Sequence, residues 1–87
     1  MKAKITGFNK MDFEIDGKKV KGTKVHYIYC DNSNDNLVGQ AADNKFVNEK
    51  LSDMLNFQEL LKADLCELDF NQNGKIVDIF PVGAGRI

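Results

Sequence analysis

The order of two hydrophobic periods along the chain is the feature that most limits how it can fold. Apolar and polar side chains alternate through residues 3–31 and again through residues 66–80, which is the period of a β-strand with one buried face. Between them, in residues 45–63, apolar side chains recur at the spacing of an amphipathic helix. The chain therefore places strands on both sides of one helical segment.

The first predicted hairpin joins a strand over residues 3–15 to a strand over residues 19–31. Asp16 and Gly17 separate the two strands, and both residue types tolerate the positive φ that a tight primed turn requires. Gly7 interrupts the first strand, and a glycine inside a strand usually marks a bulge or a sharp bend. We therefore expect a long first strand with a bulge at Gly7.

The middle of the chain is predicted to hold a short strand and the helix. The run DNSNDN at residues 31–36 consists of loop formers and ends the second strand. A third strand follows over residues 37–42, and a helix, whole or broken into two short ones, fills residues 45–63. Asp43 or Asn44 is expected to cap its N-terminus. The face of the helix that packs on the sheet is formed by Val47, Leu51, Met54, Leu55 and Leu61.

The second predicted hairpin lies in the run LCELDFNQNGKIVDIFPV, with its turn at Asn73 and Gly74. A chain of 87 residues is well below the roughly 150 residues that a typical domain occupies. We therefore expect a single OB-like domain over residues 1–82, followed by a flexible C-terminal tail at residues 83–87.

These elements occur in the order strand, strand, strand, helix, strand, strand. That order is typical of the OB-fold, so the predicted fold is mainly β with one helix: a five-stranded, OB-fold-like Greek-key barrel (β-β-β-α-β-β) with the helix across one open end. A glycine in the long first strand suits this fold, because that strand has to coil strongly. An SH3-like barrel is the alternative, and a helix of this size between the third and fourth strands favours the OB-fold.

Composition and motifs point away from an enzyme. Apolar runs are far shorter than the roughly 18 residues of a membrane span, and the N-terminus lacks the pattern of a secretion signal, so a cytoplasmic location without membrane contact is expected. Cys30 and Cys66 are predicted to be buried thiols. His26 and Cys30 would lie about 13 Å apart on a strand, too far to share a metal. No catalytic residue, metal, cofactor or small-molecule substrate is predicted.

Charge is distributed unevenly. Residues 1–24 contain seven lysines and three acidic residues, a local charge of +4, whereas the rest of the chain has a charge of -5. The basic segment includes the first hairpin and lies beside the only two tyrosines, Tyr27 and Tyr29. Local potential rather than net charge attracts a polyanion, so this hairpin is either a binding surface for nucleic acid or a solvated, lysine-protected sheet edge.

The second strand has two faces, and its orientation decides between these readings. One face carries Lys19, Lys21, Thr23, Val25, Tyr27 and Tyr29, and the other carries Val20, Gly22, Lys24, His26, Ile28 and Cys30. If Ile28 and Cys30 point into the core, the tyrosines point outward and form a platform on which bases stack. If Val25, Tyr27 and Tyr29 line the core instead, the platform does not exist.

The opening run MKAKITGFNKMDFEIDGKKVKGTKV, with a basic residue and a glycine (Lys21 and Gly22) just after a hairpin tip, resembles the small single-stranded-DNA-binding, helix-destabilising proteins of phages and plasmids. The filamentous-phage protein is the prototype of that family, and the resemblance covers about residues 1–30. It implies a homodimer that coats single-stranded DNA cooperatively, without sequence readout, during replication. The contacts that it implies are backbone contacts from Lys18, Lys19, Lys21 and Lys24 and base stacking on Tyr27 or Tyr29.

The leading prediction is therefore a non-enzymatic protein that binds single-stranded DNA, with RNA as the alternative ligand. A second prediction comes from another class of function. In it the chain is a small barrel that binds a protein partner through its acidic second half or an exposed sheet edge, and the lysines serve only solubility.

Overall fold

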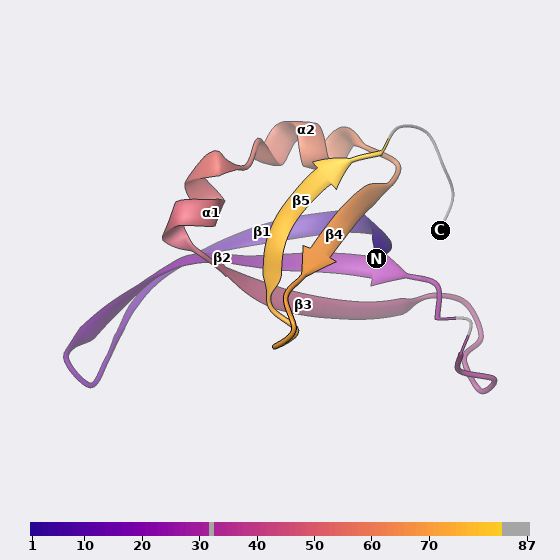
Figure 1. The fold of residues 1–87 in the computed structure, drawn as a ribbon, viewed down its shortest axis with the longest axis horizontal. Helices are drawn as coiled ribbons and strands as arrows, with labels where there is room; N and C mark the ends of the chain where they lie inside the picture. Colours follow the sequence, from indigo (N-terminus) through magenta and orange to yellow (C-terminus); the bar gives the residue numbers. More distant parts are fainter. Residues whose placement is uncertain (32, 83–87) are drawn as a thin grey trace.

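The computed structural model describes residues 1–31 and 33–82, so the tail predicted at residues 83–87 lies outside the described residues. Five strands and two short helices follow one another in the predicted order (Figure 1). The elements are β1 (Lys2–Ile15), β2 (Lys18–Tyr29), β3 (Ala41–Asn48), α1 (Glu49–Met54), α2 (Phe57–Lys62), β4 (Cys66–Phe70) and β5 (Ile76–Pro81).

All neighbouring strands pair antiparallel in one sheet of order β3-β2-β1-β4-β5. The helices lie between β3 and β4 in the chain, as the OB-fold requires. β3 and β5 are the two edges of the sheet, and no ladder joins them in the described part of the chain. The mainly β, OB-fold-like prediction is thus confirmed, with a small barrel that stays open between β3 and β5.

The strands form two layers with the core between them. The β4–β5 hairpin crosses in front of the sheet formed by β1, β2 and β3, and the helices lie along one end of the sandwich (Figure 1). Side chains from both layers and from α2 meet in one cluster. Its buried members are Ala3, Ile5, Val25, Tyr27, Val47, Leu60, Cys66, Leu68, Ile76 and Ile79.

The first hairpin has the predicted turn and the predicted bulge. Asp16 and Gly17 have φ values of 52° and 78°, so both adopt the left-handed conformation expected of a primed turn. The pairing of β1 with β2 shifts register between Ile5 and Gly7, which leaves Thr6 as the extra residue of a β-bulge. The bulge at Gly7 is confirmed.

The boundary between β3 and the helices differs from the prediction. The third strand was expected over residues 37–42, but β3 begins at Ala41 and continues to Asn48, because Val47 pairs with Thr23 of β2 and is buried. The helix therefore starts four residues later than expected, and it is capped by Asn48, whose Oδ1 accepts a hydrogen bond from the Leu51 N–H at 2.8 Å, rather than by Asp43 or Asn44.

A second asparagine cap divides the helical segment. The Asn56 side chain accepts a hydrogen bond from the Glu59 N–H and starts α2 after α1 has ended at Met54. α2 packs on β1, where the Phe57 ring stacks on Phe8 with 4.4 Å between centroids. No helix in the described residues is long and apolar enough to cross a membrane.

The two cysteines differ in burial, whereas the sequence predicted that both would be buried. Cys66 lies in the core, where burial raises the pKa of its thiol. Cys30 is exposed, because β2 ends one residue earlier and the chain turns into the loop. The second hairpin has its turn where predicted, with Gly74 at a φ of 77° and the Asn71 side chain accepting hydrogen bonds from the N–H groups of Asn73 and Lys75.

Candidate nucleic-acid interface

The structure shows which of the two faces of β2 points into the core, a question that the sequence left open. Thr23, Val25 and Tyr27 are buried against the second layer, so this row faces the core. The alternate row, which includes Lys24 and His26, therefore faces away from the core. The outward positions of β1 and β3 follow from their register with β2.

The two tyrosines are on the core side, which corrects the prediction of a tyrosine platform. Tyr27 is only 2% exposed, and Tyr29 is half-buried beside it, with 5.9 Å between the ring centroids. Tyr27 lies opposite Asp43 of β3. Burial, followed by the negative charge of Asp43, raises the pKa of Tyr27 to about 12. The Tyr27 ring therefore belongs to the core and offers no surface for a base.

Alkaline unfolding tests this placement. The folded-state pKa of Tyr27 lies above the value near 10 of an unfolded tyrosine, so stability is complete below about pH 10 and falls as the pH rises toward 12. A shift of this size corresponds to a total loss of about 3 kcal/mol, of which roughly half falls between pH 9 and pH 11. Urea unfolding of the wild type and of Tyr27→Phe at pH 9 and pH 11 measures it. The wild type should lose more stability than the variant, and equal losses would contradict a buried Tyr27 hydroxyl.

The first hairpin continues beyond the rest of the sheet as a two-stranded arm, residues 12–21, which projects from the body (Figure 1). On the arm, Lys19 and Lys21 continue the core-side row and lie directly opposite Glu14 and Asp12 of β1. Each of these two lysines thus faces a carboxylate across the ladder, which lowers the positive potential available to a phosphate.

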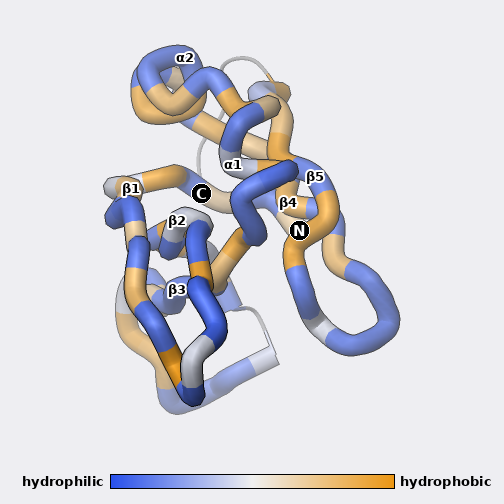
Figure 2. The backbone as a smooth tube through the Cα atoms, turned by 90° about the vertical axis from the view of Figure 1, so that its left-hand side faces the viewer, coloured by the Kyte–Doolittle hydropathy of each residue, from blue (hydrophilic) through white to orange (hydrophobic). Residues whose placement is uncertain are grey.

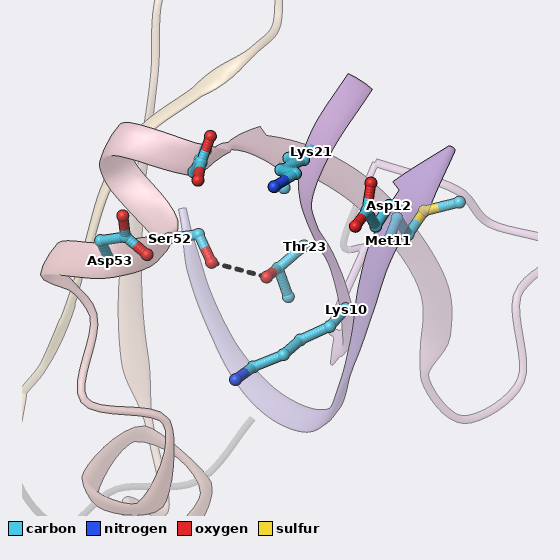
Figure 3. A pocket seen from close by; sticks show the side chains of 9 residues that line it. Lys10, Met11, Asp12, Lys21, Thr23, Ser52 and Asp53 are labelled. Carbon is cyan, nitrogen blue, oxygen red and sulfur yellow. Dashed lines mark hydrogen bonds between the residues drawn. The ribbon is translucent and has the colours of Figure 1, made fainter. Parts of the chain in front are cut away.

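The core side of the arm root is a mixed-charge pocket of about 220 Å³ (Figure 3). Ser52 of α1 and Thr23 of β2 share a hydrogen bond of 2.6 Å at its centre. The charged groups that line it are Lys10, Asp12, Lys21, Glu49 and Asp53. Three carboxylates against two ammonium groups make this pocket a poor site for a polyanion.

The opposite face of β1, β2 and β3, here called the outer face, has a different character. None of its positions is buried, and none is acidic, because Asp12, Glu14 and Asp43 occupy core-side positions. Of the four lysines predicted to contact nucleic acid, Lys18 and Lys24 are on this face. Its positions are Lys4, Gly7, Asn9, Met11, Phe13 and Ile15 of β1, Lys18, Val20, Gly22, Lys24, His26 and Ile28 of β2, and Ala42, Asn44, Phe46 and Asn48 of β3.

An aromatic ring lies at the middle of the outer face. A Cβ built on Gly22 would collide with the Val47 carbonyl oxygen of β3 and with the Cζ and Cε2 atoms of Phe46, so β3 and the ring both approach the glycine closely and the ring lies over it. Phe46 is nevertheless 39% exposed, and Lys24 is its partner across the β2–β3 ladder. An exposed phenyl face beside an ammonium group is the combination that binds an unpaired base and its phosphate.

Apolar side chains extend this face along the arm. Phe13 and Ile15 are 37% and 54% exposed, and Val20 lies opposite Phe13. In Figure 2 the arm points toward the viewer, and hydrophobic segments alternate with hydrophilic ones along it. The outer face therefore has aromatic rings at Phe13 and Phe46 and ammonium groups at Lys18 and Lys24.

Phe46 and Phe13 were not predicted as site residues. Phe46 was assigned to the helix, and Phe13 was counted only as part of an alternating strand. The one signal for Phe46 was Gly22, since a glycine inside a strand often marks a close approach of another group. In the described part of the chain, no group of three or more His, Cys, Asp or Glu side chains is arranged to hold a metal ion.

Comparison of the chain with family models, with curated proteins and with solved structures finds no match. Function is therefore argued from the residues of this chain. The feature with the clearest chemistry is the outer face, whose strand positions bring aromatic and cationic groups together, although Glu49 at the start of α1 lines the same pocket as Phe46.

Proposed function

We propose that this protein binds single-stranded nucleic acid, DNA in the first place, on the outer face of β1, β2 and β3, and that it is not an enzyme. The observation that carries the proposal is the Phe46 ring lying over Gly22, exposed and beside Lys24, on a face whose strand positions carry no acidic residue. Stacking on an aromatic side chain is worth about 1 to 3 kcal/mol per base and tolerates any sequence.

Each group on this face has a distinct role. Bases stack on Phe46 and Phe13, while the ammonium groups of Lys4, Lys18 and Lys24 neutralise phosphates. A base can stack on a phenyl ring only when its own face is uncovered, and in a duplex the neighbouring base pairs cover it. The arrangement therefore favours single strands over duplexes and gives little sequence preference.

The resemblance of residues 1–30 to the phage and plasmid proteins supports the same ligand. With it we include in the proposal a role in replication and a homodimeric state. The assignment of contacts changes, however, because Lys19, Lys21 and Tyr27 face the core side, and Phe46 takes the stacking role first given to the tyrosines.

Two matched double variants test the proposal. Lys18→Gln/Lys24→Gln removes two charges from the outer face, and Lys10→Gln/Lys62→Gln removes two charges from the side of the sheet that α2 covers, where Lys10 lies over the Phe57 ring. The measurement is titration of a fluorescent oligothymidine over a range of salt concentrations. With three phosphate contacts, the wild-type slope of log K against log salt should be about -2, at about 0.7 per contact.

The first variant should reduce the magnitude of the slope to about 0.7 and weaken binding at low salt, whereas the second should stay close to the wild type. Both variants have the same net charge, so a general electrostatic effect would act on them equally. Equal losses in the two variants would contradict the outer face as the site. Absence of binding by the wild type at low salt would contradict nucleic-acid binding altogether.

A protein-binding module is the second candidate, and one observation favours it. A pocket of about 210 Å³ with both apolar and polar lining residues lies between the helices and β5, and Met54 at its edge is 76% exposed. Glu59 and Asp78 also line this pocket, so a basic partner with an apolar anchor would fit it. This function gains support if oligothymidine does not bind.

A further inference from the structure

A second aromatic ring, that of His26, lies on the outer face. His26 is two residues beyond Lys24 along β2, and Lys24 is the ladder partner of Phe46. We propose that His26, together with the uncovered backbone at Gly7, forms a second position for an unpaired base, and that protonation of His26 strengthens binding there. The inference rests on the proposed function, because it adds a subsite and a pH response to the same face.

The geometry of the two glycines on this face carries the argument. Gly22 is covered by the Phe46 ring, as described above, whereas a Cβ added at Gly7 would meet no other atom within 4 Å. Gly7 is the direct partner of His26 across the β1–β2 ladder. The imidazole is therefore flanked by an open stretch of backbone, which leaves room for a planar group beside it.

Asn44 lies on the other side of His26, on β3. Its side chain is exposed, and an amide can both donate and accept a hydrogen bond at a base edge. The proposed subsite thus offers a histidine ring for stacking, a stacking role that histidine has in nucleic-acid-binding proteins, and an amide beside the ring.

The distance between the two proposed base positions determines which form of nucleic acid fits the outer face. Gly22, under the Phe46 ring, and His26 are four residues apart on β2, which is about 13 Å at strand rise, and Lys24 lies between them. Stacked bases in a duplex are about 3.4 Å apart along each strand. Two bases bound at these positions must be unstacked from one another, with Lys24 available for a phosphate between them. The ligand is therefore an extended single strand.

The charges around His26 determine whether protonation strengthens or weakens binding. On the outer face the charged neighbours are Lys4 of β1 and Lys24 of β2, while the β3 positions beside it are Ala42, Asn44 and Phe46, which carry no charge. No carboxylate at an outer position neutralises a protonated imidazole. A proton on His26 therefore adds one positive charge to the face that meets the phosphates.

The experiment is titration of oligothymidine at pH 7.5 and pH 5.5 with the wild type, His26→Gln and Cys30→Ser. The affinity of the wild type should rise about 3- to 10-fold at pH 5.5, and its salt slope should become steeper by about 0.7. His26 is the only histidine in the chain, so His26→Gln should bind more weakly and lose this pH response. Cys30→Ser, which alters the exposed thiol four residues away, should retain it.

Gly7→Val tests whether the open space beside His26 is needed for binding, independently of the charge on His26. Gly7→Val adds a side chain at a position where a Cβ meets no other atom within 4 Å, and Gly7 is not in a left-handed conformation, so the fold should persist with a nearly unchanged melting temperature. The added side chain should occupy the place of the base and weaken binding about 5-fold or more at both pH values.

Each outcome decides a separate question. A wild type that binds at pH 7.5 supports the proposed function. An unaltered pH response in His26→Gln, or wild-type affinity of a folded Gly7→Val, would then overturn the subsite alone. A wild type that binds at neither pH would overturn both proposals.

Discussion

Tyr27→Ala is expected to unfold the protein or to bring it close to unfolding. Tyr27 is among the core residues of β2, at 2% exposure, and it packs with side chains of both layers. Truncation of a large buried aromatic residue typically costs about 3 to 5 kcal/mol, because the lost contacts leave a cavity. A domain of this size has only about 5 to 10 kcal/mol of stability in total. Urea unfolding followed by circular dichroism measures the loss.

Two further variants make this result specific to the core. Tyr27→Phe keeps the ring and should lose far less stability than Tyr27→Ala. Tyr29→Ala removes a half-buried ring on the same side and should fall between them. A fully stable Tyr27→Ala with weakened binding to single strands would show instead that the ring faces outward, and would reverse the assignment of the two faces of β2.

Phe46→Ala is expected to weaken binding to oligothymidine about 10- to 100-fold while the protein stays folded. The ring is 39% exposed and lies outside the core cluster, so its removal takes away a stacking surface worth about 1 to 3 kcal/mol. The exposure of Gly22 adds a modest loss of stability, because the ring shields that part of the strand. Fluorescence titration and a thermal melt of the same sample measure both quantities.

Conservative replacements separate stacking from simple hydrophobic contact. Phe46→Tyr keeps an aromatic face and should bind like the wild type, whereas Phe46→Leu keeps apolar volume without the aromatic face and should bind like Phe46→Ala. Wild-type affinity of a folded Phe46→Ala would remove the observation on which the proposed function rests.

The positions of the turns, the bulge and the start of the loop could be read from the sequence because each depends on local chemistry, whereas residues 37–40, expected in the third strand, belong to the loop. Asp16 and Gly17 accept positive φ, Gly7 weakens a strand, and the asparagine-rich run at residues 31–36 cannot continue one. Together with the hydrophobic periods they gave the order of the strands and the OB-fold-like class. These features require no knowledge of what packs against them.

The start of the helix could not be read in the same way. Val47, Leu51 and Leu55 fit a helical face, and Val47 also fits the alternation of a strand. Pairing with Thr23 of β2 buries Val47 in the core, so the strand extends to Asn48, and the helix begins after it. A non-local ladder thus overrode a local pattern, which hid Phe46 from the prediction of the site.

The sequence by itself determined which residues share a face of β2, because successive side chains of a strand point to opposite sides. Only the tertiary structure decided which face is inside. Both rows contain apolar and basic residues, and the choice was made by the β4–β5 layer, which buries Val25 and Tyr27 together with Leu68 and Ile79. Lys24 and His26 face outward for this reason alone. Burial depends on the partner that covers a surface, and a strand's own alternation does not identify that partner.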